Sequence, residues 1–524
     1  MQNFILINKL QEYSKTRANK VAVTFLENCK DPKSFTYLEL YNTARGIAEK
    51  LRLFNIPAQT PIALLLNNQH SQVLYFLAAL ICNLQPAILT PPNKKIKKDY
   101  YFANLYKNLQ DCQFSVIISD FDFETSDLFH IKPESFEASG CLQAVFDNRF
   151  ENSILQFSSG TTGYKSPVVI SEDIYIKQLE TYAAAIELTT SDIIVSWLPL
   201  SHDMGFIACL NMALYFSVET VFVDPIDWVT NPQIYIEAIS KYKGTISWNP
   251  NFAYAYMAQS IELGKVKDCR LDSLRSLVNC AELVSIESQN KFYSVFSFLG
   301  LENKVFRAAY AMAEAVFALT DGPGDLVSNL NDVHYSSVGK ALNGVEFRIV
   351  DDQLNLLTCR QIGEIQVRCP FMFKTYYNNL EKTKNSFDGD WYKTGDLGFF
   401  EEDNLFICGR KKDLIISAGI NIFPNEIEEI VTESKEVIPG RVCAFGVFDT
   451  KLQTEKILVL FETKAPKEEQ TKLLIEIRTK IQAVFQCPIL EVHCCEPGYL
   501  IKSTSGKMAR RANKEQWLVS NKLN

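Results

Sequence analysis

Apolar and polar positions follow helical and strand periods in turn through the first 150 residues. Residues 36–51 carry apolar side chains at helical spacing, with Thr36 placed as an N-cap and Glu39 three residues later. Residues 73–84 are apolar enough for a buried helix. Short apolar runs of strand length lie between these helices, at 61–66, 86–89 and 114–119. Strands separated by helices predict a parallel sheet covered on both faces.

The same alternation continues to about Val338 and then changes. Further strands are predicted at 193–197, 220–223, 244–248 and 274–279. Strands joined by turns follow at 344–351, 363–368 and 397–408, which predicts a more β-rich part. After residue 411 a compact α+β segment is expected: strands at 414–417, 442–447 and 457–462, helices at 425–434 and 467–485, and a polar tail.

We therefore predict an α/β protein of two domains. Residues 1–411 would form a large N-terminal domain of two α/β sheet subdomains and a small β-rich subdomain. Residues 412–524 would form a mobile C-terminal α+β domain of normal small-domain size.

Composition excludes several classes of protein. The chain has 524 residues, is 47% hydrophobic and 22% charged, and carries a formal charge of -8, which disfavours disorder and non-specific nucleic-acid binding. The longest clean apolar run, 73–82, is shorter than the roughly 18 residues of a membrane-spanning helix, and the first 20 residues lack the pattern of a signal peptide. The 14 cysteines are scattered without metal or disulfide spacing. We expect a cytoplasmic protein with buried thiols and no integral membrane contact.

One stretch points to anion binding. A short strand from Ile154 runs into Ser158, Ser159, Gly160, Thr161, Thr162 and Gly163, and Lys165 follows. Glycines allow backbone N–H groups to turn towards an anion, hydroxyls add donors, and lysine adds a charge. The spacing differs from that of the nucleoside-triphosphatase loop, because only two residues separate the glycines. A plain polar turn has the same composition.

The order of further motifs resolves this ambiguity. They are TYLEL at 36–40, SSGTTG at 158–163, WLPLSHDMG at 197–205, NPNFAY at 249–254, NCAELVS at 279–285, AYAMAEA at 309–315, WYKTGDLG at 391–398, GRKKDLI at 409–415, GINIFPNEIEEIV at 419–431 and STSGKMARR at 503–511. This ordered set, which covers nearly the whole chain, resembles the acyl-adenylate-forming superfamily. HDMG, PNFAY, CAELVS and YAMAEA resemble fatty acyl-AMP ligases most closely.

The resemblance implies two half-reactions. A fatty, aliphatic carboxylic acid attacks the α-phosphate of ATP and expels pyrophosphate, with Mg²⁺ as cofactor. The acyl group then passes to the phosphopantetheine thiol of an acyl carrier protein. An acyl-CoA synthetase, which uses free CoA, is the alternative. An inactive nucleotide-binding relative is a third possibility.

The resemblance also assigns roles to single residues. Lys507 would contact the carboxylate and α-phosphate, and Glu314 would hold the metal. Tyr310 would stack on adenine, with Ala281 and Glu282 at the purine edge. Asp396 would accept from both ribose hydroxyls, and Arg410 would reach the ribose or phosphate side. Plainer interpretations also exist. Lys507 could belong to a solvated basic tail, Glu314 could be an exposed glutamate, Tyr310 could pack in the core, and Asp396 could be a turn aspartate.

The remaining expectations concern the acyl group and the acceptor. Trp248, Phe252, Tyr256 and Met257 would line an apolar acyl pocket, and the absence of an acid in NPNFAYAYMAQS disfavours an amino-acid substrate. His202 would gate this pocket or serve only the structure. Lys412 lies at the hinge position of the family, and Gly419 would line the pantetheine tunnel.

Three features depart from the family pattern. Lys165 is shifted and Pro167 replaces a glycine in the loop, and Ala311 replaces the glycine after Tyr310. The stretch 320–391 is too short for the inserted segment of fatty acyl-AMP ligases, and residues 409–431 resemble acyl-CoA synthetases. The last two features, the short stretch and the resemblance of residues 409–431, keep the identity of the acceptor open, whereas the altered loop is what supports an inactive relative.

Overall fold

The first sheet of the protein is parallel and buried on both faces, as the apolar runs predict. The computed structural model describes residues 4–27, 31–92, 98–122, 128–133, 138–139, 152–157, 166–330, 333–417, 420–449, 454–485, 490–502 and 507–522. In strand order, the sheet consists of β4 (Gln85–Ile88), β3 (Pro61–Leu65), β5 (Val116–Ser119), β6 (Phe129–Ile131) and β7 (Ala138–Ser139). Only β7 runs antiparallel to its neighbour. Every residue of β3 is buried, which is typical of parallel strands between helices.

The helices of this first part are α1 (Ile5–Thr16), α2 (Tyr37–Arg52), α3 (Gln69–Ile81) and α4 (Lys98–Asp111). The predicted helices at 36–51 and 73–84 correspond to α2 and α3, whereas α1 and α4 were not predicted. Thr36 caps α2 as predicted: its hydroxyl accepts from the N–H of Glu39 at 3.2 Å, and the Glu39 carboxylate accepts from the N–H of Thr36 at 2.9 Å. The capping box therefore fixes where α2 begins.

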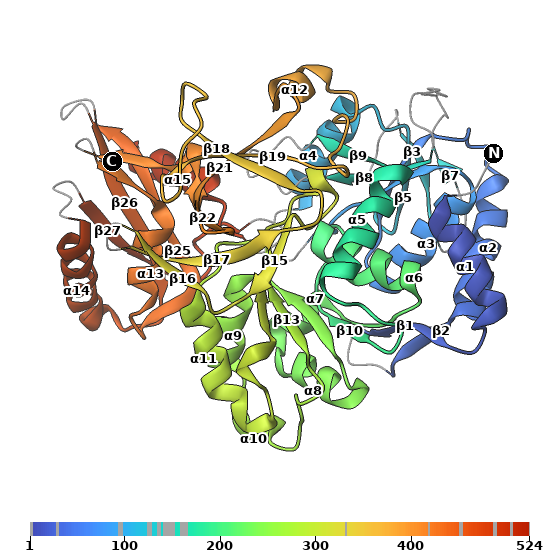
Figure 1. Cartoon of the computed structure of the whole chain (residues 1–524), viewed down its shortest axis with the longest axis horizontal. Coiled ribbons are helices and arrows are strands. Elements are labelled where there is room, and N and C mark those ends of the chain that lie inside the picture. Colours follow the sequence, from blue (N-terminus) through green and yellow to red (C-terminus); the bar gives the residue numbers. More distant parts are fainter. Residues whose placement is uncertain are drawn as a thin grey trace.

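A second, larger sheet forms the centre of the molecule (Figure 1). Its parallel strands are β14 (Phe306–Ala308), β13 (Ser276–Asn279), β12 (Ile246–Asn249), β10 (Ile193–Ser196), β11 (Glu219–Val223) and β1 (Val21–Leu26), with β2 (Lys33–Thr36) antiparallel at the edge. Helices lie on both faces. On β12 the Ser247 hydroxyl binds Tyr235 of α8 (Gln233–Tyr242), and the next residue, Trp248, binds Tyr182 of α5 (Glu172–Ala185). Successive residues of a strand point to opposite faces, so α8 and α5 cover different faces.

Smaller elements complete this region. They are β8 (Ser153–Phe157), β9 (Pro167–Ser171), the π-helix η1 (Met204–Asn211), α6 (Met212–Phe216), α7 (Pro225–Thr230), α9 (Asn251–Ser260), α10 (Leu263–Val266) and α11 (Ile286–Phe296), with short 3₁₀ turns at 297–299, 303–305 and 313–315.

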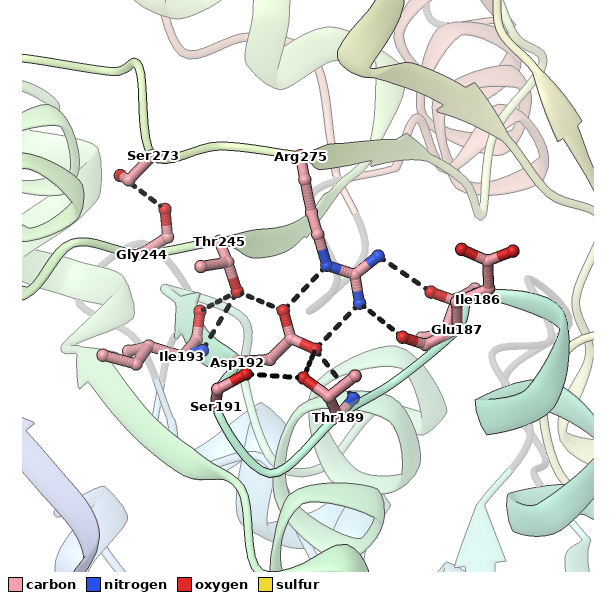
Figure 2. A network of polar contacts seen from close by, with 10 residues as sticks. All are labelled: Ile186, Glu187, Thr189, Ser191, Asp192, Ile193, Gly244, Thr245, Ser273 and Arg275. Carbon is pink, nitrogen blue, oxygen red and sulfur yellow. Dashed lines mark hydrogen bonds and ion pairs between the residues drawn. The ribbon is translucent and has the colours of Figure 1, made fainter.

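A polar network fastens the amino ends of three central strands (Figure 2). Asp192, Thr245 and Arg275 directly precede β10, β12 and β13. The Arg275 Nε and a terminal amino group each donate to Asp192 at 2.8 Å, and the Thr245 hydroxyl donates to the same carboxylate at 2.7 Å. Arg275 also donates to the carbonyl oxygens of Ile186 and Glu187. These bonds join the strand starts to the end of α5.

The β-rich part continues the large sheet from β14 with antiparallel strands. Their order is β15 (Thr320–Pro323), β17 (Val333–Ala341), β22 (Asn404–Arg410), β21 (Trp391–Glu401), β19 (Gly363–Arg368) and β18 (Glu346–Val350), with β16 (Val327–Leu330), β20 (Phe387–Asp388) and α12 (Leu380–Asn385) beside them. The predicted strands at 344–351, 363–368 and 397–408 are confirmed.

The C-terminal segment has its own sheet and core, drawn in orange to red in Figure 1. After a short 3₁₀ turn (Lys411–Asp413) it contains β23 (Ile415–Ser417), β24 (Ile420–Ile422), α13 (Pro424–Thr432), β25 (Val437–Asp449), β26 (Thr454–Thr463), α14 (Lys467–Phe485), β27 (Leu490–Cys495) and α15 (Arg510–Lys522). Leu473, Ile477 and Ile481 form the buried face of α14 at helical spacing.

The prediction of a polar tail after residue 485 is wrong. β27 adds a parallel strand to β26, and α15 ends the described chain. The Trp517 ring packs on His493 at a centroid distance of 4.3 Å, and the buried Asn513 amide bonds both backbone groups of Ile501. These few long-range contacts hold a segment that has weak apolar periodicity.

The C-terminal segment contacts the large sheet region through side chains. The Tyr335 hydroxyl of β17 donates to Glu426 of α13 at 2.8 Å, and the Lys502 ammonium lies 4.8 Å from the centroid of the Phe252 ring. Within the described part of the chain, no helix is long and apolar enough to cross a membrane.

Candidate active site

The predicted site residues gather at the carboxyl ends of the central parallel strands. His202 lies beyond the end of β10, Phe252 follows β12, Ala281 follows β13, and Tyr310 follows β14. In α/β sheets, ligands bind in the crevice outside these carboxyl ends. The fold therefore assembles the candidate residues at one edge, opposite the Asp192 network.

The predicted anion-binding loop connects two paired strands. β8 and β9 run antiparallel, with Phe157 opposite Pro167, so the two ends of the loop are adjacent. The predicted loop residues Ser158, Ser159, Gly160, Thr161, Thr162, Gly163 and Lys165 lie outside the described residues. The exit of the loop is described: the Asn379 amide donates to the Ser166 hydroxyl at 3.2 Å.

Asp396, Tyr310 and Arg410 form a polar triad. The Tyr310 hydroxyl donates to one Asp396 oxygen at 2.6 Å, and the Arg410 Nε donates to the other at 2.9 Å. Asp396 is buried, whereas the Arg410 side chain is 47% exposed. The charge of Asp396 raises the pKa of Arg410, and burial together with Asp396 raises the pKa of Tyr310. Each Asp396 oxygen keeps room for another donor, because a carboxylate oxygen accepts about two hydrogen bonds.

Glu314 lies in a short 3₁₀ turn and is held by tyrosines. The Tyr376 hydroxyl donates to a Glu314 oxygen at 2.7 Å, and the Tyr392 hydroxyl lies 3.1 Å from that of Tyr376. The carbonyl of Glu314 accepts from the N–H of Phe373 at 2.8 Å. Burial and the Glu314 charge raise the pKa of both tyrosines, so they are neutral donors.

Ala281 and Glu282 follow β13, in the segment that leads to α11, and Glu282 contacts the start of α9. Ala281 has a φ of 73°, which a residue with a side chain adopts at a cost of about 1 kcal/mol or more. The Glu282 carboxylate accepts from the N–H of Phe252 at 3.0 Å, near the start of α9. The turn with positive φ thus lies directly after β13, and the Glu282 side chain next to it ties this turn to the first residues of α9.

His202 lies just before η1, in a tight turn. A Cβ on Gly205 would lie 2.5 Å from the carbonyl oxygen of Pro199, so the turn requires glycine. Asp203 caps η1 by accepting from the N–H of Met204 at 2.9 Å. π-Helices are frequent at functional sites, and this one begins where the site residues meet.

Lys507 reaches this region from the C-terminal segment. Burial raises the pKa of Asp203, and the Lys507 ammonium acts against this increase. Lys507 also acts on buried Cys280, next to Ala281. Close by in the sequence, Arg510 pairs with Glu428 of α13. Burial and Arg410 lower the pKa of Lys412, and Gly419 lies outside the described residues.

The predicted acyl-pocket residues separate into two groups. Phe252 and Tyr256 pack against Trp228, which is buried and stacks on Trp197 at a centroid distance of 3.5 Å. Trp197 also donates to Asn249, which points to the face opposite Trp248. Trp248 instead donates to Tyr182 at 2.9 Å on the α5 face. The structure therefore brings Trp248 to neither ring of the other group.

Sequence reasoning missed five neighbours of the site: Trp197, Trp228, Tyr376, Lys382 and Tyr392. Trp197 and Tyr392 stand inside motifs that were used only for their other residues. Tyr376 and Lys382 belong to a stretch with no recognised motif, so only the fold shows that they lie beside Glu314.

A family comparison agrees with this geometry. The model of the AMP-binding enzyme family matches residues 10–377, more than half of the chain. The chain belongs to the AMP-binding enzyme family. The resemblance to acyl-adenylate-forming enzymes is thereby confirmed, and ATP use follows from the family.

Individual relatives in this family include ligases. A putative ligase of Mycobacterium tuberculosis is 31% identical over 69% of this chain and 71% of its own. The medium-chain-fatty-acid–[acyl-carrier-protein] ligase JamA of Moorena producens is 28% identical over 98% of this chain and 95% of its own. A structure from a study of fatty acyl-adenylate ligases of E. coli and L. pneumophila superimposes with a TM-score of 0.88 at 23% identity, covering 99% of this chain and 98% of the other. The predicted α/β fold class is confirmed.

Proposed function

We propose that this enzyme activates an aliphatic carboxylic acid with ATP and transfers the acyl group to the phosphopantetheine thiol of an acyl carrier protein. The observation that carries this proposal is the Asp396–Arg410–Tyr310 triad, whose carboxylate retains acceptor capacity. The charge of Glu314 acts on Arg410 of this triad, and Glu314 and Lys507 both act on Asp203. The similarity to JamA over almost the full length supports the choice of acid and acceptor.

The nucleotide would bind through its ribose and base. Asp396 would accept from the two ribose hydroxyls, because an ionised carboxylate offers acceptors only. Arg410 Nε holds Asp396, and the Arg410 side chain is 47% exposed, so its terminal amino groups would be accessible to the nucleotide. Adenine would stack on Tyr310, with Ala281 and Glu282 at its edge.

The residues around Glu314 fit a magnesium ion. Carboxylate oxygen is a hard ligand of the kind that Mg²⁺ prefers, and Tyr376 holds one oxygen and orients the other. Mg²⁺ bound there would neutralise phosphate charge. Residues 158–163 and Lys165 would bind the phosphates with backbone N–H groups, hydroxyls and one ammonium.

Adenylation then depends on holding the two negatively charged substrates in line and stabilising their charge, more than on covalent catalysis. An oxygen of the substrate carboxylate attacks the α-phosphorus, the bond from this phosphorus to the bridging oxygen breaks, and pyrophosphate leaves. Lys507 would hold the carboxylate and α-phosphate together and stabilise the charge that develops between them. His202 and the tight turn before η1 would border the acyl entrance.

The second half-reaction would need a different arrangement of two domains. We propose residues 1–411 and 412–524 as these domains, with Lys412 as the hinge; the separate core of the C-terminal segment supports this division. Rotation would remove Lys507 and bring Gly419 to a pantetheine tunnel. The thiol sulfur would attack the acyl carbonyl carbon, and AMP would leave.

The acyl group would lie against Phe252 and Tyr256. These rings pack on Trp228 and Trp197, whereas Trp248 is occupied by its bond to Tyr182. Such an apolar aromatic wall suits an aliphatic chain and offers no carboxylate partner to the α-ammonium group of an amino acid. The described cysteines are all free, which supports a cytoplasmic location.

Free CoA is the alternative acceptor. The described residues between 320 and 391 form β15 to β20, α12 and the loops that connect them. The inserted segment of fatty acyl-AMP ligases is expected to disfavour CoA, and residues 320–391 are too short to hold it. An acyl-CoA synthetase is therefore the second candidate.

An acceptor test distinguishes these functions. The full-length protein is incubated with ATP, Mg²⁺ and saturated C2 to C18 acids, and then CoA or a holo carrier protein is added. Intact-mass analysis and thioester detection should show an acyl-adenylate that moves to the carrier. Rapid acyl-CoA formation without carrier loading would favour the synthetase, and no adenylate from any acid would contradict the proposed function.

A further inference from the structure

Lys382 is a partly buried cation without a carboxylate partner among the described residues. Its ammonium lies 3.7 Å from the centroid of the Tyr376 ring. Burial lowers the pKa of Lys382, while the negative charge of Glu314 acts to raise it. A partly desolvated ammonium that makes no ion pair among the described residues costs free energy, and a bound anion would offset this cost.

The position of Lys382 is fixed beside the exit of the anion-binding loop. The Asn379 carboxamide accepts from the N–H of Lys382 at 3.0 Å and donates to the hydroxyl of Ser166 at 3.2 Å. Ser166 directly follows Lys165, the last residue of the predicted loop. One side chain thus ties the turn that carries Lys382 to the end of that loop.

The backbone makes the same connection. The N–H of Tyr377 donates to the carbonyl oxygen of Pro167 at 2.7 Å, and the N–H of Val169 donates to that of Thr375 at 3.2 Å. Residues 375–377 therefore run alongside the start of β9, the strand that leaves the loop. The place of Lys382 follows from these main-chain bonds as well as from Asn379.

Tyr376 links Lys382 to Glu314. Its ring carries the ammonium on one face, and its hydroxyl donates to Glu314 at 2.7 Å. The side chain is buried, and Thr383 accepts from its backbone N–H at 3.0 Å. A rigid tyrosine thus holds a lysine and a carboxylate at a set separation.

Resting on the proposed adenylation, we propose that Lys382 is a pyrophosphate-binding residue that contacts the β- and γ-phosphates of ATP and the departing pyrophosphate. The loop 158–165 contributes a single lysine to a group that carries several negative charges. Lysine binds phosphate as a point charge and needs no bidentate geometry. Tyr376 is the positioning residue for both Lys382 and Glu314.

The test compares Lys382→Met with Lys384→Met, an exposed lysine two residues further along α12. Calorimetry measures the affinity of the full-length protein for magnesium pyrophosphate, and isotope exchange measures the KM for pyrophosphate. We expect Lys382→Met to weaken pyrophosphate binding about tenfold, the size of one charge-assisted hydrogen bond. Lys384→Met should match the wild type, and Lys382→Arg should restore most of the affinity.

A second ligand separates binding from folding. A non-hydrolysable acyl-sulfamoyl adenosine lacks the pyrophosphate, so Lys382→Met should bind it as the wild type does. Equal pyrophosphate affinities of Lys382→Met and wild type would overturn the inference and leave the proposed function intact. Equal losses for both ligands would also overturn it, because Lys382 would then only support the structure. A wild type that shows no acid-dependent exchange and binds no pyrophosphate would overturn both.

Discussion

Two aspartate–arginine pairs lie at opposite ends of the central strands and differ in how fully they are bonded. At the amino ends, both Asp192 oxygens accept from Arg275, and Thr189 and Thr245 fill the remaining positions. At the carboxyl ends, each Asp396 oxygen has one side-chain donor, Tyr310 or Arg410. A fully bonded pair stabilises a fold, whereas a partly bonded pair can accept a ligand.

The hydrogen bonds of the fully bonded Asp192–Arg275 pair also explain the pKa of Asp192. Although burial opposes it, hydrogen bonds from Arg275, Thr189 and Thr245 lower the pKa of Asp192 to about 2. The Asp192 side chain is 4% exposed, so these bonds are poorly screened. We therefore assign Asp192 to stability and Asp396 to nucleotide binding, and the four predictions below test that division.

The largest effect is expected for Asp192→Asn. Removal of one partner of a buried ion pair leaves Arg275 without its counter-charge and should lower the free energy of unfolding by about 3–5 kcal/mol. Chemical denaturation measures this change. The KM for ATP of the folded fraction should stay at the wild-type value, and a raised KM would break the proposed division.

Asp396→Asn should have the opposite profile. Loss of the charge weakens two ribose hydrogen bonds, so kcat/KM for ATP should fall about 100-fold, or about 3 kcal/mol in transition-state stabilisation. Initial-rate kinetics measure this fall, and denaturation should show a much smaller loss of stability than for Asp192→Asn. Unchanged kinetics together with a large loss of stability would make Asp396 a structural residue.

The pH dependence of stability sharpens the assignment of Asp192. Its folded-state pKa of about 2 lies below the unfolded value of about 3.9, so its stabilisation is complete above about pH 5 and is lost as the pH falls. The full contribution is about 2.5 kcal/mol, of which about 1 kcal/mol should be lost by pH 3. The difference in unfolding free energy between wild type and Asp192→Asn should narrow by that amount between pH 6 and pH 3. A constant difference would contradict the assignment.

Thr245→Val should give the smallest effect. The variant removes the 2.7 Å hydrogen bond to Asp192 and leaves the N–H of Ile193 without its hydroxyl acceptor, and should cost about 1 kcal/mol in unfolding free energy. Thr230→Val on exposed α7 is the matched control, because the Thr230 hydroxyl bonds only carbonyls of its own helix. Equal unfolding free energies of the two variants would show that the hydrogen bond from Thr245 to Asp192 does not contribute to stability.

Local signals were enough to predict much of the fold. The capping box of Thr36 and the apolar runs of β3, β12 and β19 depend on neighbouring residues, so the sequence alone shows them. β27 and α15 depend on distant contacts such as that of Trp517 with His493, which periodicity does not reveal.

The candidate site divides in the same way. Asp396, Arg410 and Tyr310 stand in motifs, and the structure brings them together. Tyr376 reaches Glu314 across 62 positions of the chain and stands in no recognised motif. Trp248 was assigned to the acyl pocket because it is aromatic, yet strand alternation turns it towards Tyr182.

Pyrophosphate exchange with two nucleotides tests the central claim, which is that the partly bonded Asp396–Arg410 pair binds ATP for carboxylate activation. The wild-type protein is given an aliphatic acid, Mg²⁺ and labelled pyrophosphate with either ATP or 2′,3′-dideoxy-ATP. We predict acid-dependent exchange with ATP that is about 100-fold more efficient than with the dideoxy analogue, a preference that Asp396→Asn removes. Absence of acid-dependent exchange, or equal efficiency with both nucleotides in the wild type, would contradict the account.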